Sequence, residues 1–229
     1  MRRRAMAAIC STLLIATPLV SQEATAPPAV NREPSLVLPV GAVGRLALAH
    51  ELFASAGDRR DGVAAVAAAR IAAQVALLDR DRPPSLSPAA SAAETALPMP
   101  FAANAMIAVA RSYGAGDESI LTLADQAENE GTGGTIGGVT RSTALLAPGQ
   151  EAVWSLPFLS GALAEVSVIT ATTAAIDLAV ADEAGQTLCI RPGPVIASYC
   201  GWVPASNAPV TITVRNAGST DIGFWLLTN

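Results

Sequence analysis

The chain has 229 residues, of which 51% are hydrophobic and 14% charged, and its formal net charge is −5 at pH 7. This length suits one or two compact domains, and the composition is too apolar for a disordered chain. No apolar run beyond the N-terminal region reaches the roughly 18 residues that span a bilayer. We therefore expect a folded mature chain without a membrane span.

Residues 1–26 have the pattern of a cleavable export signal. Three arginines, Arg2 to Arg4, precede an apolar stretch from Ala5 to Val20, and small residues follow. An uncleaved membrane anchor is the alternative, but about 16 residues interrupted by Pro18 are few for a helix that crosses the hydrocarbon core. We expect cleavage between Ser21 and Ala26, and a periplasmic or secreted protein.

The charge balance of the mature chain excludes two classes of partner. Removing the signal takes away three arginines and Glu23, which leaves 11 basic and 18 acidic residues and a formal net charge of −7. Binding to nucleic acid or to an anionic membrane needs a basic face that displaces counterions. The remaining arginines are scattered among more numerous carboxylates, so we expect neither partner.

Two cysteines remain after export, because Cys10 lies in the apolar part of the signal. An even pair in an oxidising compartment predicts a disulfide between Cys189 and Cys200, with two separately buried thiols as the alternative. Both residues lie on consecutive strand candidates, 186–191 and 197–203, separated by a proline-containing turn. We expect a hairpin in which they stand opposite each other, with Cα atoms ~4.5 Å apart.

The N-terminal half of the mature chain has helical periodicity. A proline-rich lead-in at 27–40 precedes the helical region 41–130. Apolar residues at three- and four-residue steps predict one helix from Val43 to Gly57. A second, Ala-rich helix is predicted through Val63 to Leu78, with Asp58 or Asp61 as its N-cap.

The region continues with a loop and two further helices. Five prolines at 83–100 predict the loop. A third helix is predicted at 101–113, ending at Gly114, and Asp117 is expected to cap a fourth that buries Ile120, Leu121 and Ala124.

Beyond residue 130 the periodicity changes from helical to that of strands. Five glycines at 131–138 predict a flexible linker, which we extend to 131–142. Apolar and polar residues then alternate at 163–170, 176–180 and 210–214, with turn sequences between them. The predicted fold class is α+β, a small Ala-rich helical region followed by an antiparallel jelly-roll-like β-sandwich at 143–229.

Short motifs in the second half resemble the bacterial pre-peptidase C-terminal domain family. They are Ile176 to Val180 with the turn 182–185, Cys200 followed by Trp202 and Pro204, the strand 211–216, and the ending 224–229. The resemblance covers roughly residues 148–229. It implies a jelly-roll-like sandwich that accompanies secreted proteins without being their catalytic part. Some members carry a calcium site near this strand, of which only Asp177 remains here because Ala175 replaces the other carboxylate. Calcium needs six to eight oxygen ligands, so an outward-facing Asp177 without a metal is the favoured interpretation.

The chain offers few groups for catalysis. His50 is the only histidine, so a serine or cysteine nucleophile would have to use it as base, and its place beside Leu46 and Phe53 favours a packing role. Adjacent carboxylates such as Asp117-Glu118 are expected at helix starts and turns. No catalytic residue and no cofactor is predicted.

These observations favour an exported, non-enzymatic binding or accessory module for an envelope protein, peptide or glycan. The alternative is an extracytoplasmic hydrolase or hydrolase subunit that uses carboxylates the sequence does not reveal. An exposed apolar or aromatic patch would favour binding, and clustered carboxylates in a concave pocket between the two halves would favour catalysis.

Overall fold

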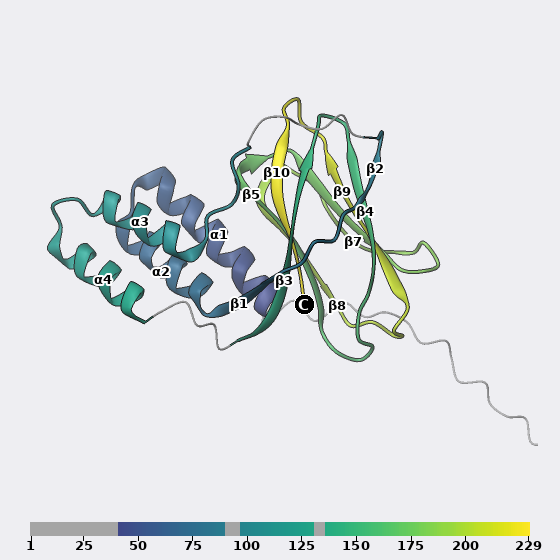
Figure 1. The fold of residues 1–229 in the computed structure, drawn as a ribbon, viewed down its shortest axis with the longest axis horizontal. Helices are drawn as coiled ribbons and strands as arrows, with labels where there is room; N and C mark the ends of the chain where they lie inside the picture. The colour runs from purple at the N-terminus through teal and green to yellow at the C-terminus, as the bar shows by residue number, and fades with distance from the viewer. Residues whose placement is uncertain (1–40, 90–96, 131–135) are drawn as a thin grey trace, which may run out of the picture.

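The computed structural model describes residues 41–89, 97–130 and 136–229, so the predicted signal, lead-in and Cys10 lie outside it. In these residues a layer of helices packs against a sandwich of two β-sheets (Figure 1). The helices are α1 (Ala42–Arg59), α2 (Gly62–Ala73), α3 (Ala103–Tyr113) and α4 (Glu118–Asn129). The strands are β1 (Val75–Asp79), β2 (Ser85–Ser87), β3 (Ile136–Leu146), β4 (Glu151–Pro157), β5 (Ala164–Ala174), β6 (Ile176–Ala181), β7 (Thr187–Arg191), β8 (Val195–Trp202), β9 (Pro209–Asn216) and β10 (Ile222–Thr228).

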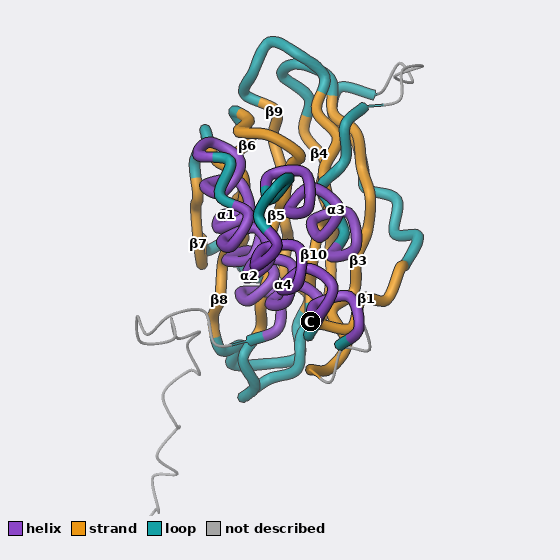
Figure 2. The backbone as a smooth tube through the Cα atoms, turned by 90° about the vertical axis from the view of Figure 1, so that its left-hand side faces the viewer, coloured by secondary structure: helices purple, strands orange, loops and turns teal. Residues whose placement is uncertain are grey.

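Each sheet has five strands. The sheet next to the helices has the order β1-β3-β10-β5-β8, and the second has the order β2-β4-β9-β6-β7. Only β1 and β3 pair in parallel, and every other described pair is antiparallel. Figure 2 shows the helices lying over the face of the first sheet. The predicted α+β class with a β-sandwich is confirmed.

The caps that the sequence predicts are present. The carboxylate of Asp61 accepts the backbone N–H of Ala64, and that of Asp117 accepts the N–H of Ser119. These side chains satisfy donors that the first turn of a helix leaves free.

The second helix is shorter than predicted. It ends at Ala73, and residues 75–79 form β1, which pairs with β3. The expectation of helix to Leu78 is therefore wrong. A short apolar run has no decisive period, and here backbone hydrogen bonds to a strand some 60 residues away decide its structure.

Two further boundaries differ from expectation. Residues 85–87, within the loop predicted at 83–100, form β2 and pair with β4. Residues 136–142, within the linker predicted at 131–142, belong to β3. The segment 75–87 thus supplies an edge strand to each sheet, and the predicted division between helices and sandwich runs through a strand.

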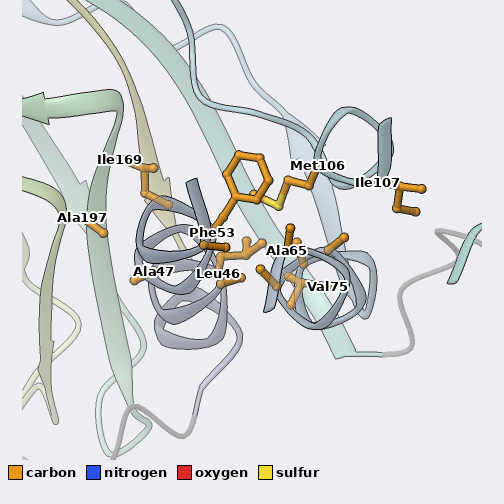
Figure 3. Packing of buried hydrophobic residues seen from close by; sticks show 14 of the residues in the cluster. Leu46, Ala47, Phe53, Ala65, Val75, Met106, Ile107, Ile169 and Ala197 are labelled. Carbon is orange, nitrogen blue, oxygen red and sulfur yellow. The ribbon is translucent and has the colours of Figure 1, made fainter. Parts of the chain in front are cut away.

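Strand β10 connects two hydrophobic cores because both of its faces are buried. Phe224 and Leu226 point between the sheets, while Trp225 and Leu227 pack under the helices. Figure 3 shows residues of the core between the helices and the first sheet, with side chains of α1 to α3 packed toward that sheet. Its labelled members include Leu46, Phe53, Ala65, Met106, Ile169 and Ala197.

The disulfide between Cys189 and Cys200 is present, but not within a hairpin. Cys189 lies on β7 in the second sheet and Cys200 on β8 in the first, with Cα atoms 6.0 Å apart. The chain crosses from one sheet to the other after Arg191, so β7 pairs with β6 and β8 with β5. The predicted hairpin register is wrong, and the bridge instead joins the two sheets through their buried inner faces.

Among the described residues, no helix has the length and apolar character that crossing a membrane requires.

Candidate functional site

A buried carboxylate fixes α1 on the first sheet. Glu165 on β5 is 1% exposed, and it accepts the backbone N–H of Gly44 at 3.2 Å and the hydroxyl of Tyr199 at 2.9 Å. Burial and the adjacent carboxylate raise the pKa of Tyr199, which keeps its hydroxyl protonated as the donor. The first turn of α1 is therefore held by a side chain from the sandwich, and this contact sets where the rest of the helix lies.

The far end of α1 borders an open cleft of about 450 Å³. The last turns of α1 form one wall, and the end of β5 with β8 forms another. The cleft is lined by His50, Phe53, Ala54, Gly57, Asp58, Phe101, Tyr113, Thr170, Ala171, Thr172, Thr173 and Ile196.

Three aromatic side chains reach this cleft from separate segments. Phe53 belongs to the apolar stripe of α1, Phe101 precedes α3, and Tyr113 is the last residue of α3. The rings of Phe53 and Phe101 have centroids 5.3 Å apart. Three aromatic rings thus line the cleft together with alanines, a glycine and an isoleucine, and threonines from β5 are the main polar residues.

Among the residues that the structure describes, Asp58 is the only carboxylate that lines the cleft. It is exposed, and no ion pair joins it to another described residue. The neighbouring arginines have other contacts: Arg59 donates to the hydroxyl of Ser55, and Arg60 lies 5.7 Å from the ring centroid of Tyr113. Asp58 stands at the C-terminal end of α1, where the helix dipole is negative.

His50 separates the cleft from a second hollow of about 360 Å³. Its Nδ1 lies 2.8 Å from the carbonyl oxygen of Leu46, and its Nε2 lies 3.1 Å from that of Phe101. The ring meets Trp225 edge-on at 5.7 Å. Both nitrogens therefore face backbone acceptors, and neither is directed at a hydroxyl or thiol that it could activate.

A neutral imidazole has a single N–H, so it can donate to only one of these two carbonyl groups at a time. Burial lowers the pKa of His50, although both carbonyl contacts act in the opposite direction. The desolvation cost is the largest contribution, and the neutral ring is the dominant form near pH 7. His50 thus acts as a packing residue, in agreement with the interpretation of its sequence position.

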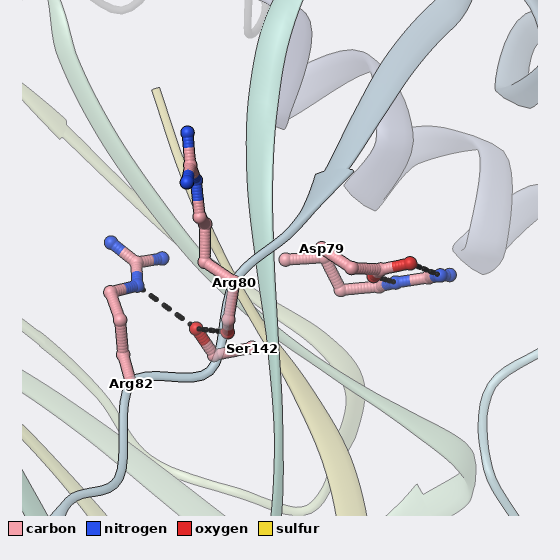
Figure 4. A network of polar contacts seen from close by, with 5 residues as sticks. Asp79, Arg80, Arg82 and Ser142 are labelled. Atoms are coloured by element: carbon pink, nitrogen blue, oxygen red, sulfur yellow. Dashed lines mark hydrogen bonds and ion pairs between the residues drawn. The ribbon is translucent and has the colours of Figure 1, made fainter.

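Arg141, which lines the second hollow, forms an ion pair with Asp79. Arg141 lies over the ring of Trp225 at 4.5 Å and donates to both carboxylate oxygens of Asp79, at 2.6 and 2.9 Å. The hydrogen bonds from Arg141 lower the pKa of Asp79. Figure 4 shows Asp79, with dashed lines marking its contacts.

Figure 4 also shows how the segment that crosses between the sheets is fastened. Arg82 donates from Nε to the hydroxyl of Ser142, which itself donates to the carbonyl of Arg80. The carbonyl of Arg82 accepts the indole N–H of Trp154 at 2.7 Å. Burial lowers the pKa of the half-buried Arg82. Through these contacts Arg82 has a structural role, since it holds the segment between β1 and β2 against both sheets.

Asp177 has a structural partner in the turn between the sheets. Its carboxylate accepts the backbone N–H of Gly193 at 2.9 Å, and Arg215 stands opposite it on β9. Among the described residues, no group of three or more His, Cys, Asp or Glu side chains could hold a metal ion together. Asp177 therefore fastens the turn that carries the chain from β7 to β8.

The carboxylates of Asp117, Asp182 and Glu128 do not line the cleft. Asp117 caps α4, Asp182 accepts the N–H groups of Ala184 and Gln186 in a turn, and Glu128 pairs with Arg111. Sequence reasoning did not identify Asp58, Phe101 or Tyr113 as site residues. No local pattern joins them, because they meet only when α1, α3 and β5 pack together.

Comparisons with known proteins give structural likenesses at low identity. No family model matches the chain, and no curated protein matches it. A pre-peptidase C-terminal domain of collagenase from Bacillus anthracis has 14% identity and a TM-score of 0.33, covering 39% of this chain and 88% of that one.

Two further solved structures are similar to about the same extent. The periplasmic inhibitor of g-type lysozyme, PliG, from Aeromonas hydrophila has 11% identity and a TM-score of 0.30, covering 40% of this chain and 84% of that one. A carbohydrate-binding module of Cellvibrio mixtus lichenase 5A has 12% identity and a TM-score of 0.25, covering 40% and 86%. At these values the likenesses carry no argument about ligand or activity.

Proposed function

We propose that the protein is an exported, non-enzymatic binding or accessory module whose binding site is the aromatic cleft between α1 and the end of β5. The observation that carries this proposal is the lining of the cleft: three aromatic rings and several threonines surround a single carboxylate. Ligand sites are typically concave, mostly apolar surfaces with a few polar groups that fix orientation. This lining has that composition.

The alternative, a hydrolase, would need a second group to exchange protons with Asp58. His50 is the other titratable side chain near it besides Tyr113, and both ring nitrogens of His50 face carbonyl oxygens. The cleft therefore favours binding over acid–base chemistry.

Export is part of the proposal and rests on the sequence of residues 1–26 and on the disulfide. A bridge between Cys189 and Cys200 suits an oxidising compartment. Membership of the pre-peptidase C-terminal family is likewise proposed, on the motifs around Ile176 to Val180 and Cys200 to Pro204. An accessory role follows from that resemblance.

The outer face of the second sheet is a less suitable glycan platform. Thr213 on β9 stands there in register with Ala179 on β6, and Arg215 stands opposite Asp177. The exposed Ile190 on β7 pairs with Ala179 on the same face. Aromatic rings, which usually supply the flat stacking surface for sugars, lie in the cleft instead. A ligand that uses aromatic contacts is therefore proposed to bind in the cleft.

The test is to block the cleft and measure binding. Ala54→Trp places a large ring in the cleft, and Thr213→Trp, on the outer face of the second sheet, is the matched control. Compounds from a mixed library of amines, acids, sugars and short peptides are screened by ligand-observed NMR. We expect binders of the wild-type protein to bind Thr213→Trp and not Ala54→Trp. Equal binding to both variants, or chemical turnover of a bound compound, contradicts the proposal.

A further inference from the structure

The cleft carries one unpaired charge, and from this we infer the class of its ligand: a small organic cation with an aromatic or aliphatic body, for which Asp58 is the counter-ion. This inference rests on the binding function proposed above. The cleft would select a positively charged group, and Asp58 would be the residue that selects it.

The electrostatic part of the argument comes from the end of α1. Asp58 lies at the cleft without an ion-pair partner among the described residues. The last turn of a helix carries a negative partial charge, which adds to the carboxylate because Gly57 and Asp58 both line the cleft. The adjacent cations do not line it, and Arg59 is engaged with Ser55. A cationic ligand head would fill this place without displacing an existing ion pair.

The aromatic walls suit the same class of ligand. The face of an aromatic ring carries negative charge density, which attracts cations, and the ring also packs against an apolar body. Tyr113 already makes such a contact with the guanidinium of Arg60, at 5.7 Å. Phe101, which is 39% exposed, provides further ring surface in the same cleft and packs against the mostly buried Phe53. A volume of about 450 Å³ is that of a site for a small molecule.

An anionic ligand is disfavoured on the same grounds. It would approach Asp58 and the negative helix end. The two arginines that follow Asp58 do not line the cleft, since Arg59 contacts Ser55 and Arg60 lies against the ring of Tyr113. A neutral ligand would use the rings but would gain nothing from the carboxylate. The three charge classes are therefore separable by experiment.

The experiment uses three probes of nearly equal size: 2-phenylethylamine, 2-phenylethanol and phenylacetate. Each is titrated at pH 7.5 into the ¹⁵N-labelled wild-type protein, into Asp58→Asn, and into Glu183→Gln as a matched loss of one exposed carboxylate in the β6–β7 turn. Backbone amide signals of Gly57 and Thr172 report occupancy of the cleft. We expect the amine to bind about fivefold more tightly than the alcohol, as an exposed ion pair allows, and phenylacetate to bind most weakly. Asp58→Asn should reduce the affinity for the amine to that for the alcohol. Glu183→Gln should leave the affinity for the amine unchanged.

The other outcomes separate this inference from the proposed function. Equal affinity for amine and alcohol, unaffected by Asp58→Asn, overturns the cationic ligand and leaves the cleft as a binding site. Amine binding that shifts amides outside the cleft, or no shift with any probe, also overturns the inference. The proposed function is decided separately, by whether Ala54→Trp blocks the binders found in the mixed library.

Discussion

The carboxylate of Glu165 accepts the backbone N–H of Gly44 at 3.2 Å, so a side chain of the sandwich caps a helix that begins more than 120 residues earlier. The N-cap residue of α1 is Gly41, which has no side chain to fill this role. Charged acceptors are favoured at helix N-termini because they complement both the free N–H groups and the dipole. This contact joins α1 to the first sheet by a hydrogen bond.

Replacing Glu165 with Gln should destabilise the protein. The amide keeps the size of the side chain but removes the charge that faces the helix and leaves an N–H₂ group beside donors. The expected loss is about 1–3 kcal/mol, which lowers the melting temperature by roughly 5 °C in a protein of this size. Thermal unfolding followed by circular dichroism measures this loss, with Glu151→Gln, at an exposed pair with Arg215, as the control. An unchanged melting temperature would show that the cap contributes nothing.

The stability of the protein should decrease with acidification below pH 6.5 through His50. Burial lowers the pKa of His50 in the folded state, so the unfolded chain binds a proton more readily. Stability contributed by the neutral ring is complete above the unfolded pKa of about 6.5 and is lost as the pH falls from there towards the folded pKa. Since His50 is the only histidine, His50→Phe should flatten this part of the profile of free energy of unfolding against pH. A variant with the same slope as wild type between pH 6.5 and 5 would contradict the assignment.

Removing the bridge between Cys189 and Cys200 should reduce stability by more than its loop length suggests. Closing a loop of this size contributes ~3 kcal/mol in the chain-entropy model, and here the bond also fixes the two sheets to each other. We expect the variant with both cysteines changed to Ala to melt roughly 5–10 °C lower. Alkylation of the native protein without reductant, read by mass spectrometry, should label neither residue. Two labelled thiols in the purified protein would refute the bridge.

A fragment of residues 136–229 should not form a stable domain, which revises the two-part organisation that the glycine run suggests. Without the helices, the first sheet would expose Val139, Ile169, Trp225 and Leu227, and both edge strands β1 and β2 would be missing. Large exposed apolar faces favour aggregation or loss of specific packing. We expect the fragment to bind a hydrophobic dye and to unfold without a cooperative transition. A monomeric fragment with a sharp thermal transition would restore the idea of two independent units.

Features that depend on neighbouring residues could be predicted from the sequence. Asp61 and Asp117 precede helical stripes at the spacing of an N-cap, and both make the expected contact. Strand β6 alternates Ile176, Leu178 and Val180 inward, as its pattern indicates. The fold class follows from such local periods.

Features that depend on distant pairing could not be predicted. Residues Val75 to Asp79 form a strand only because β3 lies beside them. Packing after the turn at 192–194 decides which of the two sheets β8 joins. The cleft has the same origin, since Asp58, Phe101 and Tyr113 carry no shared motif. The two cysteines were found by counting, but their place between the sheets was not.

The position of β10 inside the first sheet has a consequence for the order of folding. This strand is the last of the described strands along the chain, yet it pairs with β3 on one side and β5 on the other. Until residues 222–228 have been synthesised, the pair β1–β3 cannot join the pair β5–β8 in one sheet. The core between the helices and this sheet also lacks Trp225 and Leu227 until then. A growing chain therefore passes most of its synthesis without a complete core.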